Sequence, residues 1–297
     1  MKVFLTGGTG VIGTRAVPAL VAAGHEVTAV ARTDPKAALV RSLGASPATV
    51  DLFDAAAVKA AVDGHEAVIH LATNIPPLSK AALPKAWTTN ERLRSEGSNN
   101  LVDAALATGA THYVQESIAF PYLDQGDAWI NEDAPLEHVG AFTGAADAEA
   151  AAARFAASGV TGVVLRFAQF HGPGSSHVEA FNAMARKRIN PFVGDPDGYV
   201  SFVHADDAGS AVAAALTVPS GTYNVADDEP LTRREAGVVL AEALGVKPPK
   251  TVPAAVRAAL PRSGKLLMKS LRISNARFKQ ASGWAPAHPS IRGSWAP

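Results

Sequence analysis

The chain has 297 residues, of which 47% are hydrophobic and 18% are charged. These fractions are close to globular averages, so the chain can bury a core, and they exclude a short fragment or a disordered segment. Basic and acidic side chains balance at 27 each, which gives no overall attraction to nucleic acid or to an anionic membrane. The absence of cysteine excludes disulfides, zinc–thiolate sites and a cysteine nucleophile.

The amino-terminal residues leave no room for a signal peptide, because residues 1–6 lead directly into glycines. The longest stretch without a formal charge, residues 208–226, contains a Pro-Ser-Gly interruption and does not resemble a membrane span. No basic stretch is interleaved with aromatic residues, and His65 and His70 are one position too far apart for an HExxH zinc motif. The sequence therefore predicts a cytoplasmic protein with no membrane, nucleic-acid or metal site.

Short β-rich runs alternate with alanine-rich segments of helical period through the first 166 residues. This alternation is typical of βαβ units whose strands form a parallel sheet covered by helices on both faces. The fold class is therefore predicted as α/β, with a doubly wound, Rossmann-type parallel sheet. The expected strands are Lys2 to Thr6, Glu26 to Ala31, Ala48 to Asp51, Ala67 to Leu71, Thr111 to Ser117 and Gly162 to Arg166.

The regular alternation weakens after Arg166, where loops rich in glycine and proline begin. From residue 231 onward, helices with proline-rich breaks are expected. The sequence thus predicts a second, smaller α/β region at the carboxyl end of the chain. Before residue 231 it predicts loops at 171–174 and 194–198, a strand at 199–203, a helix at 206–216 and a strand at 222–225.

A glycine-rich loop lies between the first expected strand and the first expected helix. Its GxxGxxG spacing lets the chain turn tightly, lets the backbone approach a pyrophosphate and directs the amino end of the helix at the anion. Dinucleotide binding is the prediction, and a purely structural turn is the alternative. The loop residues expected at the cofactor are Gly7, Thr9, Gly10, Val11, Ile12 and Gly13.

The end of the second expected strand indicates which dinucleotide is bound. An NAD site places an acidic side chain there to accept hydrogen bonds from the ribose, whereas this sequence has Ala31-Arg32. A guanidinium can bind the 2′-phosphate of NADP in a bidentate, charge-assisted way. Arg32 therefore favours NADP over NAD, with a solvated loop residue as the alternative interpretation of this arginine.

Several short motifs follow one another along the chain: Val50-Asp51-Leu52-Phe53-Asp54, Val68-Ile69-His70-Leu71-Ala72, Leu165-Arg166, His171-Gly172-Pro173-Gly174, Phe202-Val203-His204-Ala205-Asp206-Asp207 and Tyr223-Asn224-Val225. With them the sequence resembles the extended short-chain dehydrogenase/reductase family, also called the NAD-dependent epimerase/dehydratase family, over almost the whole chain. The resemblance implies that Asp51 and Leu52 lie beside the adenine, and that Leu71, Ala72 and Thr73 border the cofactor.

The resemblance also implies a division into two regions. Residues 1–170 would form the dinucleotide-binding domain and residues 171–297 the substrate-binding region that caps it, with about 199–225 returning to the first domain. Relatives commonly pair through helices beside the sheet. The expected partners are therefore a small-molecule substrate and a second copy of the chain, in a homodimer.

The catalytic residues of the family are only partly present. Ser117 corresponds to the serine that hydrogen-bonds the substrate oxygen, although a strand-end serine can also be satisfied locally. The Tyr and the Lys four residues later are absent, since no tyrosine has a lysine at that spacing and no lysine occurs between Lys85 and Lys187. Losing such acid–base help typically removes about 10²–10⁴ in rate, so ordinary alcohol–ketone chemistry is not expected.

Two residues are considered as replacement proton donors. Tyr122 lies five residues after Ser117, in a loop expected to border the nicotinamide. His171 lies in the Gly-Pro-Gly loop, and an imidazole titrates near neutrality. The alternatives are packing for Tyr122 and solvent exposure for His171.

Charge is unevenly distributed along the chain. After Glu242 no acidic residue occurs while ten basic residues do, so the preceding part carries a net charge of −10. Because the family's carboxyl-terminal part caps the substrate, an anionic substrate is one interpretation, and a solvated basic face that meets another subunit is the other. The resemblance implies one more expectation, because many sugar-nucleotide relatives carry an arginine shortly before the Phe202-Val203-His204 segment that reaches the diphosphate. No arginine stands shortly before Phe202 here, which argues against a nucleotide sugar.

Three functions are compatible with these residues. The first is an NADP(H)-dependent oxidoreductase that reduces a small carbonyl or enone-type molecule, for which hydride transfer needs little acid catalysis. The second is a redox-neutral dehydratase, isomerase or cyclase on the same scaffold. The third is a non-catalytic regulator that senses NADP.

Overall fold

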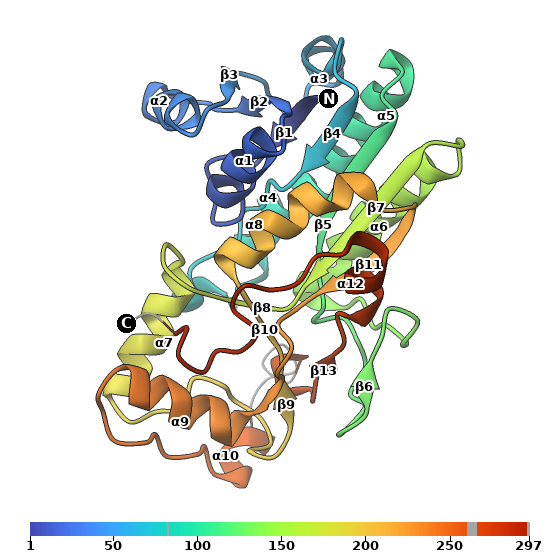
Figure 1. Cartoon of the computed structure of the whole chain (residues 1–297). Coiled ribbons are helices and arrows are strands. Elements are labelled where there is room, and N and C mark those ends of the chain that lie inside the picture. Colours follow the sequence, from blue (N-terminus) through green and yellow to red (C-terminus); the bar gives the residue numbers. More distant parts are fainter. Residues whose placement is uncertain (82, 260–265, 296–297) are drawn as a thin grey trace.

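The computed structural model describes residues 1–81, 83–259 and 266–295 of the chain. Its centre is a seven-stranded sheet in the order β11-β7-β5-β4-β1-β2-β3, in which every neighbouring pair is parallel (Figure 1). The strand order reverses beside β1, so the predicted Rossmann-type fold class is confirmed. The strands are β1 (Lys2–Thr6), β2 (Glu26–Val30), β3 (Ser46–Ala48), β4 (Ala67–His70), β5 (His112–Ile118), β7 (Thr161–Phe167) and β11 (Gly221–Val225).

The expected strands agree with the observed ones except at β3, which ends at Ala48, where a strand was expected to begin. The side chain of Asp51 explains the difference. Its Oδ1 accepts a hydrogen bond from the Phe53 N–H at 3.0 Å, which closes a turn and takes the chain out of the sheet. Pro47 is tolerated within β3 because this strand lies at the edge of the sheet.

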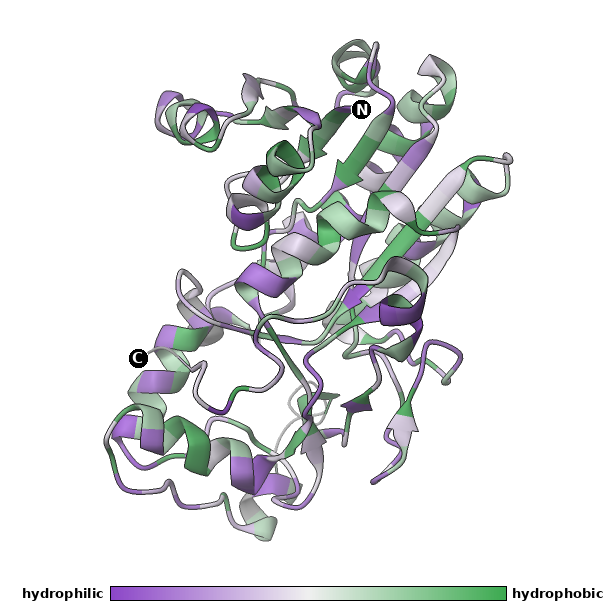
Figure 2. Ribbon diagram, viewed as in Figure 1, coloured by the Kyte–Doolittle hydropathy of each residue, from purple (hydrophilic) through white to green (hydrophobic). Residues whose placement is uncertain are grey.

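Helices cover both faces of the sheet, and each face has its own apolar core (Figure 1). Figure 2 shows that the central strands are mostly apolar, as expected for strands that are covered on both faces. One face is covered by α1 (Gly13–Ala22), α2 (Asp34–Ser42), α8 (Ala205–Ala214) and α12 (Ala276–Ser282), and the other by α3 (Ala55–Val62), α5 (Ser98–Thr108) and α6 (Thr143–Ala156).

A smaller region with a third apolar core lies beyond the carboxyl ends of the strands (Figure 1). The single strand expected at 199–203 is divided in two, because the Ser201 hydroxyl donates to the Leu271 carbonyl and accepts from the Ile273 N–H. Whether residue 170 marks a domain boundary stays a prediction. The region contains β6 (Trp129–Ile130), β8 (Gln169–His171), β9 (Tyr199–Val200), β10 (Phe202–His204), β12 (Leu231–Thr232), β13 (Arg272–Ile273), α7 (Ser176–Arg186), α9 (Arg233–Ala243) and α10 (Ala254–Ala258).

In the part of the chain that the structure describes, no helix is both long and apolar enough to cross a membrane. The expectation of a cytoplasmic location stays a prediction.

Helices α1 and α8 cross at very close range. A Cβ atom built on Gly209 of α8 would lie 2.3 Å from the Cβ of Arg15 and 2.7 Å from its carbonyl carbon. Real carbon atoms do not approach this closely, so only glycine allows the two backbones to meet here. The crossing holds α1, and with it the glycine-rich loop that precedes it, against the segment that follows β10.

Substitution Gly209→Ala is expected to destabilise the protein, because the added methyl group must push α1 and α8 apart. Overpacking of this kind costs about 1–3 kcal/mol in the free energy of unfolding. The measurement is chemical denaturation at equilibrium, with Ala214→Ser on the half-buried side of the same helix as the control. Equal stability of the two variants would contradict the close packing of α1 and α8.

Candidate functional site

The glycine-rich loop packs backbone against backbone at the carboxyl edge of the sheet. Gly7 has a φ of +79°, and a Cβ on it would lie 2.5 Å from the carbonyl carbon of Leu71. A Cβ on Gly13 would lie 2.1 Å from the Gly7 oxygen, while the Gly10 N–H donates to that oxygen at 2.9 Å. Only glycine therefore fits at Gly7 and Gly13, and the loop leads directly into the amino end of α1, the part of a helix that favours an anion.

The other residues expected at the cofactor share this edge of the sheet. Leu71, Ala72 and Thr73 follow β4, Asp51 and Leu52 follow β3, and Thr9, Val11 and Ile12 belong to the loop itself. Arg32 follows β2, is exposed, and forms no ion pair among the described residues. The carboxyl edge beside β1 is where dinucleotides bind in folds of this kind, so these residues fit a dinucleotide. Their individual contacts stay predictions.

Ser117 lies at the carboxyl end of β5, is fully buried and donates a hydrogen bond to Glu149. The distance from Ser117 Oγ to Glu149 Oε1 is 2.6 Å. Glu149, on α6, also forms a bidentate ion pair with Arg166 of β7, with N–O distances of 2.9 and 2.6 Å. The single hydroxyl hydrogen of Ser117 is therefore directed at a carboxylate.

Tyr122 joins the same buried network. Its hydroxyl accepts a hydrogen bond from Arg166 Nη1 and donates one to Asn224 Oδ1, both at 2.8 Å. Burial raises the pKa of this phenol. The structure thus links Ser117 and Tyr122 through Glu149 and Arg166, two residues for which the sequence predicted no role. Arg166 belongs to one of the family motifs, whereas no local signal indicated Glu149.

His171 lies apart from this network, at the end of β8. Its fully buried ring stacks on Trp295, with centroids 5.8 Å apart, and meets the His204 ring edge-on at 4.9 Å. Neither ring nitrogen has a hydrogen-bond partner among the described residues. Burial lowers the pKa of His171 to about 3, so the ring is neutral at physiological pH. The catalytic roles expected for Ser117, Tyr122 and His171 stay predictions.

His204, Asp206 and His288 also lie close together, and one ligand atom of each falls within 4.8 Å of the others. The two imidazole rings are stacked with centroids 3.8 Å apart, so their lone pairs run side by side rather than toward a common point. His204 Nδ1 already accepts from the Asp206 N–H, and the Asp206 carboxylate already pairs with Arg15. This group is therefore poorly arranged to hold a metal ion.

A second buried ion pair lies on the other side of β5. Arg94 belongs to η3 (Leu93–Gly97), a π-helical turn between α4 (Thr88–Arg92) and α5. Its Nη2 donates to both carboxylate oxygens of Glu116, at 2.8 and 2.7 Å, and each side chain is 4% exposed. Burial raises the pKa of Glu116, and the adjacent guanidinium opposes that effect. Because Glu116 precedes Ser117 directly, the two ion pairs extend from opposite faces of one strand end.

The first turn of α6 is the segment in which the family carries its Tyr and Lys. Glu91 Oε2 accepts hydrogen bonds there from the Gly144 N–H at 2.6 Å and from the Thr143 hydroxyl at 2.7 Å. Ala145, in the same turn, is fully buried. A carboxylate from α4 therefore caps the helix at the place where the family would present a phenol and an ammonium group.

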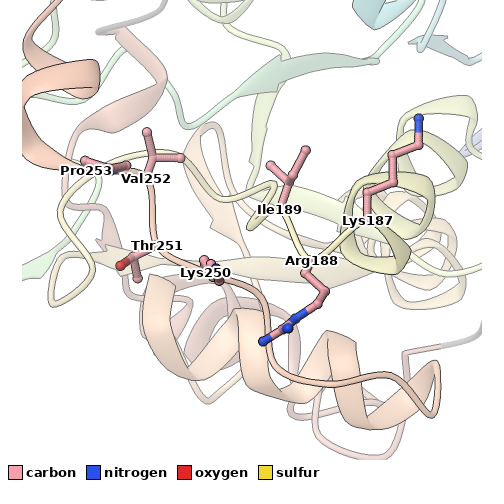
Figure 3. Close-up of a pocket in the computed structure, with 7 residues that line it drawn as sticks. All are labelled: Lys187, Arg188, Ile189, Lys250, Thr251, Val252 and Pro253. Atoms are coloured by element: carbon pink, nitrogen blue, oxygen red, sulfur yellow. The ribbon is translucent and has the colours of Figure 1, made fainter.

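A surface hollow of about 420 Å³ lies away from this site, between residues 187–189 and 250–253. Figure 3 shows that Lys187 and Arg188 extend from it in opposite directions, so these positive charges do not converge on one ligand. The hollow is therefore not part of the candidate site.

The comparison with protein families agrees with this geometry. The model of the NAD dependent epimerase/dehydratase family matches residues 3–226. The chain belongs to this family. Solved structures that resemble this family member contain either nucleotide: a human epimerase family protein, SDR39U1, contains NADPH, and a UDP-glucose 4-epimerase of Thermus thermophilus contains NAD.

Two curated relatives are reductases. A 3-diazoavenalumate denitrifying reductase from a Streptomyces species is 37% identical over 307 aligned positions, which cover 98% of each chain. A 2-alkyl-3-oxoalkanoate reductase from Shewanella oneidensis is 27% identical, over 93% of this chain and 76% of that one.

The solved structures establish the shared fold. The human protein has a TM-score of 0.81 at 23% identity, and a UDP-glucose 4-epimerase of Thermotoga maritima with UDP-glucose has a TM-score of 0.79 at 20% identity. Both alignments cover 99% of this chain and 97% of the other chain. The epimerase/dehydratase-family fold therefore extends over the smaller carboxyl-terminal region as well.

Substitution Glu149→Gln is expected to destabilise the protein strongly, because it leaves the Arg166 guanidinium buried without a counter-charge. Breaking one partner of a buried ion pair costs about 3–5 kcal/mol in the free energy of unfolding. Asp103→Asn is the matched control, since Asp103 forms an exposed pair with Arg154 of the same helix, and such pairs contribute about 0–1 kcal/mol. Equilibrium denaturation measures both, and a loss at Glu149 no larger than the control would show that Arg166 does not depend on this carboxylate.

Proposed function

We propose that the protein is an NADP(H)-dependent reductase that transfers a hydride to a small molecule which is already electrophilic enough to react without a strong proton donor. Enones and activated carbonyl compounds are acceptors of this kind. The observation that carries the proposal is the combination of a glycine-rich loop, in which Gly7 and Gly13 leave no room for a side chain, with an α6 first turn that has neither Tyr nor Lys. A second copy of the chain, in a homodimer, is proposed as a partner but is not needed for this chemistry.

The cofactor preference rests on charge at the end of β2. Arg32 is exposed and forms no ion pair among the described residues, and Ala31-Arg32 stands where an NAD site carries its acidic residue, with Asp34 two positions later at the start of α2. When bound, the reduced nucleotide supplies the hydride and is oxidised, while the acceptor is reduced and takes a proton from solvent. Gly7, Gly10 and Gly13 would hold the pyrophosphate, and Arg32 the 2′-phosphate.

The class of hydride acceptor that we propose follows from the hydrogen bonds of the Ser117 and Tyr122 hydroxyl groups. Ser117 donates to Glu149 and Tyr122 donates to Asn224, so neither hydrogen is free to be given to an acceptor oxygen in this arrangement. Burial raises the pKa of Tyr122 even though Arg166 donates to its hydroxyl, so this phenol is a poor acid at neutral pH. Acceptors that need protonation during hydride transfer are therefore disfavoured.

The relatives support reduction over redox-neutral chemistry. The Streptomyces relative, which matches over 98% of both chains, is named a denitrifying reductase of a diazo compound. A diazo or diazonium group is an electron-poor acceptor whose loss of dinitrogen drives the reaction, so its reduction by hydride needs no Tyr–Lys pair. Such a compound belongs in the acceptor panel beside enones and carbonyl compounds.

The test follows NADPH absorbance with a panel of enones, activated carbonyl compounds, simple ketones and one aryl diazonium salt. Oxidation of NADPH is expected with the activated acceptors and not with the simple ketones, because the latter need acid assistance. Tight binding of NADPH without oxidation by any acceptor would overturn the proposal. Product formation without NADPH consumption would instead select a dehydratase, isomerase or cyclase.

Substitution Arg32→Ala is expected to weaken NADPH binding about 10–100-fold, since charge-assisted hydrogen bonds contribute about 1.5–3 kcal/mol. The affinity for NADH should change less than twofold, because NADH lacks the 2′-phosphate. Isothermal titration calorimetry with both nucleotides measures the two values, and Arg41→Ala on α2 is the control. A parallel loss for both nucleotides would show that Arg32 does not recognise the 2′-phosphate.

A further inference from the structure

One segment of the chain passes along the carboxyl edge of the sheet. β7 ends at Phe167, and β5 and β4 lie between it and β1 in the sheet. Pro173 contacts α1, the helix that follows β1, so the chain covers three strand spacings, or about 14 Å, between these two points. Residues 168–174, the edge segment, therefore extend past the carboxyl ends of β5 and β4, and Figure 1 shows the chain continuing from β7 through β8 toward α7.

Arg15 of α1 holds the edge segment in place. Its Nη2 donates to the Pro173 carbonyl at 2.8 Å, its Nη1 to the Val11 carbonyl at 3.3 Å, and its Nε to Asp206 Oδ1 at 3.2 Å. These three acceptors belong to the edge segment, to the glycine-rich loop and to the first turn of α8. Because the guanidinium is planar and rigid, it fixes the spacing between the two loops.

The ring of His204 limits the edge segment as well. Gly172 has a φ of +98°, and a Cβ on it would lie 2.7 Å from His204 Nε2, so only glycine fits beside this ring. The ring is itself fixed, because its Nδ1 accepts from the Asp206 N–H at 3.2 Å. The edge segment is therefore bound by Arg15 and confined by a side chain that belongs to the same turn as the Asp206 partner of Arg15.

The edge segment borders one half of the proposed cofactor site. Arg32 and Asp51, the residues expected at the adenine end, follow β2 and β3, which lie on one side of β1 in the sheet. β4, β5 and β7 lie on the other side of β1. With the pyrophosphate at the glycine-rich loop, the nicotinamide half of a dinucleotide extends toward β4 and β5, the strands whose carboxyl ends the edge segment passes.

We propose that Arg15 is a positioning residue for the cofactor, which keeps the edge segment beside the glycine-rich loop so that this segment covers the nicotinamide half and slows its release. The inference rests on the cofactor part of the proposed function. It requires no contact between Arg15 and the nucleotide, since each of the three guanidinium nitrogens already donates to a protein oxygen.

The test compares NADPH with adenosine 2′,5′-bisphosphate, which keeps the adenine half and lacks the nicotinamide half. Arg15→Gln removes the guanidinium that joins the two loops. Asp206→Asn is the matched control, because it removes only the partner of Arg15 that is 56% exposed and leaves both carbonyl contacts. Thermal unfolding verifies that each variant folds. Arg15→Lys, which keeps the charge but has no second NH₂ group, carries the test where Arg15→Gln does not fold.

Arg15→Gln is expected to raise the dissociation rate of NADPH about 5–20-fold and to change the affinity for adenosine 2′,5′-bisphosphate less than about twofold. Asp206→Asn should change both values less than about twofold, since exposed ion pairs contribute little. Without nucleotide, hydrogen exchange of residues 168–174 should become faster in Arg15→Gln, because the edge segment loses its attachment to α1.

Unchanged NADPH dissociation or unchanged hydrogen exchange would overturn the inference. An equal loss for both ligands would also overturn it, because the effect would then come from the charge of Arg15 or from the glycine-rich loop, which both ligands share. Absence of nucleotide binding by the unsubstituted protein is a different result. It would overturn the proposed function itself, and the inference with it.

Discussion

Two buried ion pairs hold the carboxyl end of β5, and the arrangement of the site depends on them. Glu116 pairs with Arg94 on one side of the strand, and Glu149, which receives the Ser117 hydroxyl, pairs with Arg166 on the other. Buried pairs of this kind add little net stability compared with apolar residues of the same shape, because both charges lose their hydration. Their main effect is to fix the relative positions of the elements that carry them. If η3, α6 or β7 moved away from this strand end, a buried charge would lose its partner.

The same pairs engage the two hydroxyls of the site. Each guanidinium is matched by a carboxylate, so the charge near β5 is balanced within the protein, and the Ser117 and Tyr122 hydroxyls are engaged by this balance. In a Tyr–Lys site the ammonium lowers the pKa of the phenol and releases its proton to the substrate. Here Arg166 also donates to the Tyr122 hydroxyl, but its charge is balanced by Glu149. This arrangement supports the proposed function, in which the site binds a hydride donor and has no strong acid.

The parts of the molecule that could be predicted from sequence are those set by local sterics. Gly7 and Gly13 are required by contacts within or beside one short loop. The strands of the first half were predicted correctly because apolar runs alternate with helices that end at glycine, a pattern that repeats over short distances along the chain. The ion pairs were not predicted, because Arg94 and Glu116 are 22 residues apart and Glu149 and Arg166 are 17 apart, with no pattern that links them. The predicted position of β3 was wrong because the turn closed by Asp51 ends the strand early at the edge of the sheet.

The charge asymmetry along the sequence is partly balanced in the folded chain. The carboxyl-terminal segment is basic, and several of its basic residues form ion pairs within the same chain. Of the eight basic residues of this segment that the structure describes, four form ion pairs with acidic residues of the preceding part, namely Lys269 with Glu137, Arg277 with Glu132 and Asp133, Lys279 with Asp228, and Arg292 with Glu229 and Glu235. The pairs of Lys279 and Arg292 are exposed and contribute about 0–1 kcal/mol each, whereas Lys269 and Glu132 are largely buried. Basic residues that are already paired attract an anion weakly, and the composition alone therefore provides little reason to expect an anionic substrate.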